Sequence, residues 1–153
     1  MFNDGGAISG SFVYDADTNA YSSIDVTTTD GSIRSGAHYT LHNPCCADDP
    51  TFLLFVTGVG GSLAGTPVLS AFLFAPMTNA GGTIGLDPAG AYHSEESCDF
   101  ADCGGPAPPQ RDVVSGSVTA STVPEPGTFV LALPAFALIA SRRKWLSNRF
   151  GSR

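Results

Sequence analysis

The chain has 153 residues, enough for one modest domain, and its 18 glycines and 11 prolines fall short of the content typical of disorder. Its formal net charge is −7, with 14 acidic residues against 7 lysines and arginines. Because nucleic-acid phosphates require clustered lysine and arginine, this composition argues against a nucleic-acid partner. Few lysines and glutamates beside much serine, threonine, glycine, valine and phenylalanine favour strands over helices.

The first two predicted strands form a hairpin. Residues 8–14 place Ile8, Gly10, Phe12 and Tyr14 on one face, and residues 21–29 place Ser22, Ile24, Val26 and Thr28 on one face. Residues 15–19 are rich in Asp and Asn and read as the turn between them.

Further strands are predicted at 37–42, 51–56, 68–74 and 111–119, with residues 75–109 mostly loop apart from a weak strand at 83–86. Runs of this length and spacing predict a mainly β body, an antiparallel β-sandwich or meander. On a single strand over 37–42, His38 and His42 would lie about 13 Å apart, too far to share a metal ion.

The four cysteines, Cys45, Cys46, Cys98 and Cys103, predict two disulfides in an exported protein. Cys45 and Cys46 are adjacent and cannot easily bond to each other. Either each joins one of Cys98 and Cys103, or those two form a local bridge, so the pairing stays open.

Candidate chemistry in the body is sparse. Asp15, Asp17 and Asn19 alternate as candidate calcium ligands, although turn chemistry explains the same residues. The carboxylates at 95, 96, 99 and 102 lie in a predicted loop and read as exposed. No catalytic signature is present, so we expect no enzyme, no catalytic residue and no cofactor other than the candidate calcium.

Charge divides the chain at about residue 123. Residues 1–123 hold 13 of the acidic residues and two basic ones, a net charge near −11, whereas residues 142–153 hold five basic residues and no acid. We therefore expect a β-rich exported domain at 1–122 and a separate tail at 123–153. An exported protein needs a secretory signal, which residues 1–6 do not resemble, so we expect it upstream of Met1.

The tail has three parts in order. Pro124, Glu125 and Pro126 form a stiff break, residues 128–140 are apolar apart from Thr128, and a basic stop follows at Arg142, Arg143 and Lys144. A helix of about 13 residues spans about 20 Å against a hydrocarbon core near 30 Å, so this single transmembrane helix would be marginal. Its membrane-facing residues would be Phe129, Val130, Leu131, Leu133, Phe136, Leu138 and Ile139.

This ordered triple resembles the PEP-CTERM sorting signal of Gram-negative bacteria. The resemblance covers about a fifth of the chain and implies recognition and cleavage by exosortase, an integral-membrane cysteine transpeptidase. It also implies a transient stay in the inner membrane with the body in the periplasm, then release to the cell surface or outside. A plain anchor that is never cut, or a helix packed on the body, is the alternative for the tail.

The body also resembles the secreted domains of that family, which mostly lack an assigned activity and accompany exopolysaccharide and biofilm. We therefore expect a cell-surface or extracellular-matrix protein with exosortase and the inner membrane as partners, and exopolysaccharide as a candidate partner. The alternative is a carbohydrate- or Ca²⁺-binding extracellular module, suggested by the acidic body and by Tyr14, Tyr21, Tyr39 and Tyr92.

Overall fold

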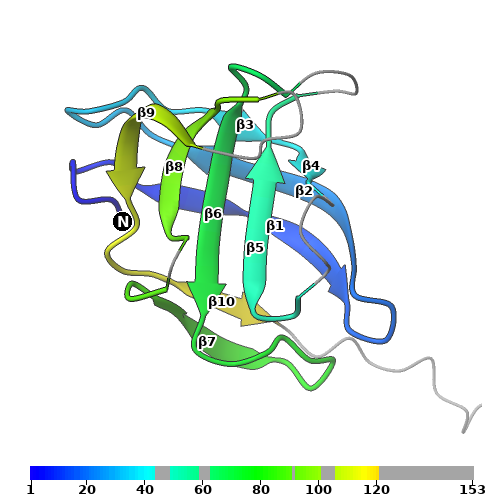
Figure 1. Cartoon of the computed structure of the whole chain (residues 1–153). Coiled ribbons are helices and arrows are strands. Elements are labelled where there is room, and N and C mark those ends of the chain that lie inside the picture. Colours follow the sequence, from blue (N-terminus) through cyan, green and yellow to red (C-terminus); the bar gives the residue numbers. More distant parts are fainter. Residues whose placement is uncertain (44–48, 59–62, 91, 101–105, 121–153) are drawn as a thin grey trace, which may run out of the picture. The chain divides into compact units, whose positions relative to one another are not determined.

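The regular structure of the described chain consists of antiparallel strands (Figure 1). The computed structural model describes residues 1–43, 49–58, 63–90, 92–100 and 106–120. Its strands are β1 (Ile8–Asp15), β2 (Ala20–Thr28), β3 (His38–Tyr39), β4 (Leu41–His42), β5 (Phe52–Val56), β6 (Pro67–Leu73), β7 (Gly82–Asp87), β8 (Ser94–Cys98), β9 (Pro106–Asp112) and β10 (Ser117–Ala120). The predicted mainly β, antiparallel class is confirmed for this part of the chain.

The smaller sheet has the order β1-β2-β3 and begins with the predicted hairpin. Asp15 closes the turn, because its carboxylate accepts from the Asp17 N–H at 2.9 Å and from the Thr18 hydroxyl at 2.8 Å. Asn19 takes the left-handed conformation, with φ of 54°, that such a turn requires.

A β-bulge interrupts the hairpin near its middle. Ser11 pairs with Asp25 and Val13 with Ser22, so two residues of β2 lie opposite one residue of β1. The bulge reverses which side of β2 faces inward. Ile24 and Val26 face the core as predicted, but Ser22 is exposed and Tyr21 packs against the core instead.

The larger sheet has the order β10-β7-β6-β5-β4, with β8 and β9 continuing from one end of β6. Residues 67–69 of β6 pair with β8, whereas Phe72 and Leu73 pair with β7. Between them, the buried Ser70 hydroxyl donates to the Ser94 carbonyl at 3.3 Å and accepts from its N–H at 3.4 Å. This side chain satisfies backbone groups at the point where the sheet forks.

The two sheets share one hydrophobic core. Figure 1 shows β1 and β2 crossing behind β5 and β6. The buried cluster between them draws on both sheets and on the flanking segments: Phe2, Ile24, Val26, Tyr39, Leu53, Phe55, Leu69, Leu73, Met77 and Val113. Alternate residues of β5 and β6 point to the other side of the sheet, where Leu54, Val56, Val68 and Cys98 form a second cluster. The larger sheet is therefore apolar on both faces.

Three of the predicted strand assignments are wrong. The strand expected over 37–42 breaks at Thr40, since β3 pairs with β2 whereas β4 pairs with β5 in the other sheet. The strand expected over 111–119 is two strands, β9 and β10. Strand β8 and most of β9 lie in the segment predicted as loop. The residues of β8 are mostly polar and β9 contains three prolines, so neither segment has the pattern expected of a strand.

All of these strands belong to one compact unit, Met1–Thr122. No helix occurs among the described residues, and hence none there that could cross a membrane. The predicted C-terminal transmembrane helix lies outside them.

Candidate functional site

The predicted sorting residues all lie outside the described residues. This holds for Pro124, Glu125 and Pro126, for the apolar segment and for the basic stop at 142–144. The sorting signal therefore stays a prediction from sequence.

Of the four cysteines, only Cys98 is described. It lies at the end of β8, is 1% exposed and is disulfide-bonded. Cys45, Cys46 and Cys103 lie outside the described residues, so the pairing stays open.

The candidate calcium ligands line the β1–β2 turn, where two of them have their side-chain oxygens in hydrogen bonds. Asp15 accepts two local hydrogen bonds, and Asn19 Oδ1 accepts from the Tyr14 hydroxyl at 2.6 Å. The hydrogen bonds to the Thr18 hydroxyl and the Asp17 N–H lower the pKa of Asp15. Turn formation thus accounts for these side chains. Within the described ranges, no three His, Cys, Asp or Glu residues gather as metal ligands would.

His38 lies in β3 beside an exposed carboxylate. Its Nε2 is 2.8 Å from Asp25 Oδ1, and the two side chains are 57% and 75% exposed. Because this pair stands on an open sheet face, it lacks the water-excluding surroundings in which a catalytic His–Asp pair works.

A buried ionic network lies where β8 and β9 pair. Glu95 and Arg111 stand opposite each other, and neither exposes any surface. Arg111 Nε donates to Glu95 Oε2 at 2.7 Å, and Nη2 lies 2.5 Å from that oxygen, an ion-pair contact rather than a second aligned hydrogen bond. Glu95 Oε1 accepts from the hydroxyls of Tyr39 at 2.6 Å and Thr28 at 2.8 Å. Both carboxylate oxygens are therefore satisfied.

A second carboxylate, Asp4, reaches the same guanidinium. Arg111 Nη1 lies 3.3 Å from Asp4 Oδ2, and both side chains are fully buried. Burial raises the pKa of Asp4, but the N–H groups of Gly6 and Ile33 and the Arg111 guanidinium together hold this pKa below its ordinary value. Asp4 therefore stays ionised in the folded protein.

The network holds distant segments of the chain together. Arg111 Nη1 also donates to the Arg34 carbonyl at 3.2 Å, and its guanidinium carbon lies 4.1 Å from the centre of the Phe2 ring. Burial, followed by the hydrogen bond and charge of Glu95, raises the pKa of Tyr39 far above its ordinary value, so Tyr39 remains a neutral donor. A site this closed suits stabilisation rather than turnover.

The sequence does not reveal this network, because its pattern predicts an exposed loop at Glu95. Glu95 is fully buried, whereas its neighbour Glu96 is partly exposed. Partial burial raises the pKa of Glu96, although the Ser94 hydroxyl and the charge of Arg34 act to lower it. One signal was available: Arg111 is one of only two basic residues in the body, and a scarce cation in an acidic domain favours a specific partner.

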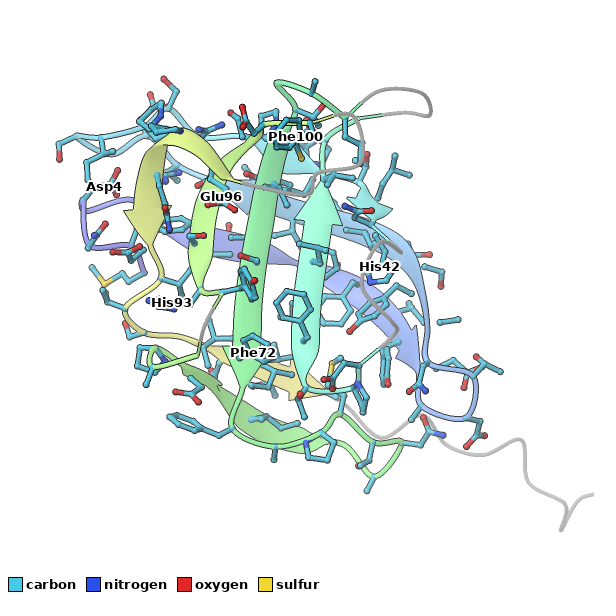
Figure 2. All side chains as sticks on the ribbon, viewed as in Figure 1. Asp4, His42, Phe72, His93, Glu96 and Phe100 are labelled. Carbon is cyan, nitrogen blue, oxygen red and sulfur yellow. The ribbon has the colours of Figure 1, made fainter. Side chains whose placement is uncertain are left out.

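A surface groove of about 410 Å³ lies between β2 and the chain around β4. It is lined by Tyr21, Ser22, Ser23, Ile24, Thr40, Leu41 and His42. The rings of Tyr21 and His42 stack, with centroids 4.4 Å apart and planes 19° from parallel. Figure 2 shows His42 to the side of β5. The groove exists because the bulge turns Tyr21 inward and because the chain crosses between sheets at Thr40.

The Tyr21 ring is held firmly in place. Tyr14 lies 4.9 Å from it, Phe12 5.7 Å and Phe55 5.8 Å, all between ring centroids. The Tyr21 hydroxyl donates to the Phe52 carbonyl at 3.2 Å. The aromatic wall of the groove is thus preorganised by the core.

A second aromatic group lies on the outer face of the larger sheet, where Figure 2 shows Phe72 over β6. This outer aromatic cluster consists of Phe52, Phe72 and Tyr92. Phe52 lies 4.6 Å from Phe72 and 6.3 Å from Tyr92, between centroids, and Tyr92 is 60% exposed. Gly90 lies directly beneath Phe72, where an added Cβ would meet the ring at 2.8 Å.

The four tyrosines that suggested a binding surface have different positions. Tyr39 is fully buried in the ionic network, and Tyr14 and Tyr21 pack against the core. Only Tyr92 is largely exposed. Tyr21 keeps part of its surface in the groove.

The chain matches no protein-family model, and comparison with curated proteins and with solved structures found no similar one. Its function must therefore be argued from its own residues.

Proposed function

We propose that this is an exported cell-surface or extracellular-matrix protein, associated with exopolysaccharide and biofilm, that exosortase sorts through its C-terminal tail. The observation that carries the proposal is the order of three parts in residues 124–144: Pro-Glu-Pro, an apolar stretch and a basic stop. The body would stand in the periplasm while the tail rests in the inner membrane, since positive residues favour the cytoplasmic side.

Two features of the body support export. Cys98 is disulfide-bonded, and disulfides persist mainly in oxidising compartments outside the cytoplasm. The body is also strongly acidic, which favours solubility at a surface crowded with other molecules. We propose no enzymatic activity for it.

Processing of a Glu125→Ala variant tests the sorting proposal. The full chain, preceded by a working signal peptide, would be expressed in a host that has an exosortase. We expect Glu125→Ala to leave a longer product retained in the membrane, whereas Thr128→Ala, just outside the tripeptide, is processed as usual. Normal release of the Glu125→Ala protein would refute the assignment.

A second proposed function is a carbohydrate- or Ca²⁺-binding extracellular module. The groove and the outer aromatic cluster favour carbohydrate, because sugars pack their C–H faces on aromatic rings and exchange hydrogen bonds at their edges. Calcium is less favoured, because Asp15 and Asn19 already hold the turn through hydrogen bonds.

A further inference from the structure

The groove beside β2 combines the two kinds of surface that a sugar ring requires. Ile24, Leu41 and the stacked Tyr21–His42 rings supply apolar and aromatic surface. Ser22, Ser23 and Thr40 add exposed hydroxyls, each of which can donate and accept a hydrogen bond. The outer aromatic cluster supplies stacking surface but only one hydroxyl, that of Tyr92.

The lining also selects against charge. Among the described residues that line the groove, none is an Asp, Glu, Lys or Arg. An ionic group placed there would lose water without gaining a permanently charged partner, whereas a neutral polyol would exchange water for hydroxyls. The volume of about 410 Å³ lies at the lower end of the range for small-molecule sites, which suits one or two sugar rings.

Backbone strain coincides with the groove. Ser23 has φ of 49°, a left-handed conformation that costs a non-glycine residue about 1–2 kcal/mol. Glycine would remove the strain at this position but would also remove the hydroxyl. Strained residues of this kind cluster at functional sites, and bulges beside such sites re-aim side chains.

We infer that this groove binds a neutral sugar residue, with the Tyr21–His42 wall stacking on one ring face and Ser22, Ser23 and Thr40 bonding its hydroxyls. The inference rests on the second proposed function, carbohydrate binding, and names its site. It does not depend on the sorting proposal.

Titration with neutral sugars tests the site. The full-length chain would be held in a detergent without a sugar headgroup and titrated with glucose, galactose, mannose and their neutral oligosaccharides, followed by calorimetry. We expect Thr40→Val to weaken binding about three- to tenfold, the loss expected of one hydrogen bond. Thr27→Val, which removes an exposed hydroxyl elsewhere on β2, should leave binding unchanged.

Two further variants separate a binding role from a structural one. Ser22→Tyr, at an exposed position, should fill the groove and abolish binding while the unfolding midpoint stays the same. Ser23→Gly should raise the unfolding midpoint and still weaken binding, a combination that damage to the fold cannot produce.

Other outcomes overturn the inference in distinguishable ways. If Tyr92→Ala abolishes sugar binding and the groove variants do not, the site is the outer aromatic cluster and carbohydrate binding survives. If no neutral sugar binds, both the groove assignment and the carbohydrate proposal are overturned, and the Glu125→Ala result still decides sorting independently. If only anionic sugars bind, the inference that the ligand is a neutral sugar is overturned.

Discussion

At the scale of single residues, one cation organises one end of the core. Arg111 stands between the carboxylates of Glu95 and Asp4, and all three side chains are buried. Composition shows that the body has few cations, but it does not show where their partners lie. Pairing across β8 and β9 is a long-range contact, and the prolines of β9 concealed the strand that makes it.

Removing this cation should lower the stability of the body substantially. We expect Arg111→Met to cost about 3–5 kcal/mol in the free energy of unfolding, because two buried carboxylates lose their counter-charge. Chemical denaturation measures this cost. As a control, His38→Ala removes one member of the exposed pair with Asp25 and should cost at most about 1 kcal/mol. Equal, small losses in both variants would contradict a stabilising role for the network.

The same residues set the pH limits of stability. The pKa of Asp4 is below its ordinary 3.8 in the folded protein, so its contribution is present above that pH and is lost as the pH falls below it. The pKa of Tyr39 is above its ordinary 10.0, so its contribution is present below pH 10 and is lost as the pH rises beyond it.

The free energy of unfolding should therefore decline at both acid and alkaline pH, which gives its pH profile an acid limb and an alkaline limb. Asp4→Asn should flatten the acid limb, and Tyr39→Phe should flatten the alkaline limb. If the acid and alkaline limbs keep their slopes in these variants, groups other than Asp4 and Tyr39 cause the pH dependence of stability.

At the scale of elements, the local sequence pattern predicts strands in which apolar and polar residues alternate. It misses strands whose buried faces depend on pairing with segments far away in the chain. The β1–β2 hairpin followed from period-2 alternation and an Asp/Asn turn. The bulge in β2 did not, because Ser22 and Ser23 carry no sign of which will be the extra residue. The crossing at Thr40, which forms one wall of the groove, also depends on pairing with β5 rather than on local sequence. The groove was therefore beyond prediction from sequence, although Tyr21 had been singled out.

Close approach of the hairpin strands requires glycine at position 10. Gly10 has φ of 141°, and an added Cβ would lie 2.1 Å from the Asp25 carbonyl oxygen, a backbone atom that cannot move aside. We expect Gly10→Ala to lower the free energy of unfolding by more than about 1 kcal/mol. Thermal unfolding checks this, with the exposed neighbour change Ser9→Ala expected to stay within about 0.5 kcal/mol. A neutral Gly10→Ala would mean that β1 does not approach β2 so closely.

At the scale of the whole molecule, charge and composition predict a body and a separate tail. The mainly β class followed from composition, and the core is assembled from residues within Met1–Thr122. The sequence predicts a boundary near residue 123, because net charge, proline content and apolar content all change there. It could not reveal the sheet order, which depends on contacts between segments far apart in the chain.

A chain ending at Thr122 should therefore unfold with the same midpoint as the full chain. Ending the chain at Gly116 instead removes β10, whose Val118 packs against the core, and should lower the midpoint. Circular dichroism with heating compares the three proteins. A lower midpoint for the chain ending at Thr122 would show that the body needs residues beyond it.

The prolines of β9 affect how the protein behaves when many copies of it lie close together. Pro106, Pro108 and Pro109 lack the N–H groups through which an edge strand recruits another chain, and among the described strands β9 pairs with β8 alone. A protein that accumulates beside many copies of itself is exposed to fibril formation through its sheet edges. Without these N–H donors, a neighbouring copy can form fewer ladder hydrogen bonds at this edge, and we expect β9 to resist edge-to-edge pairing.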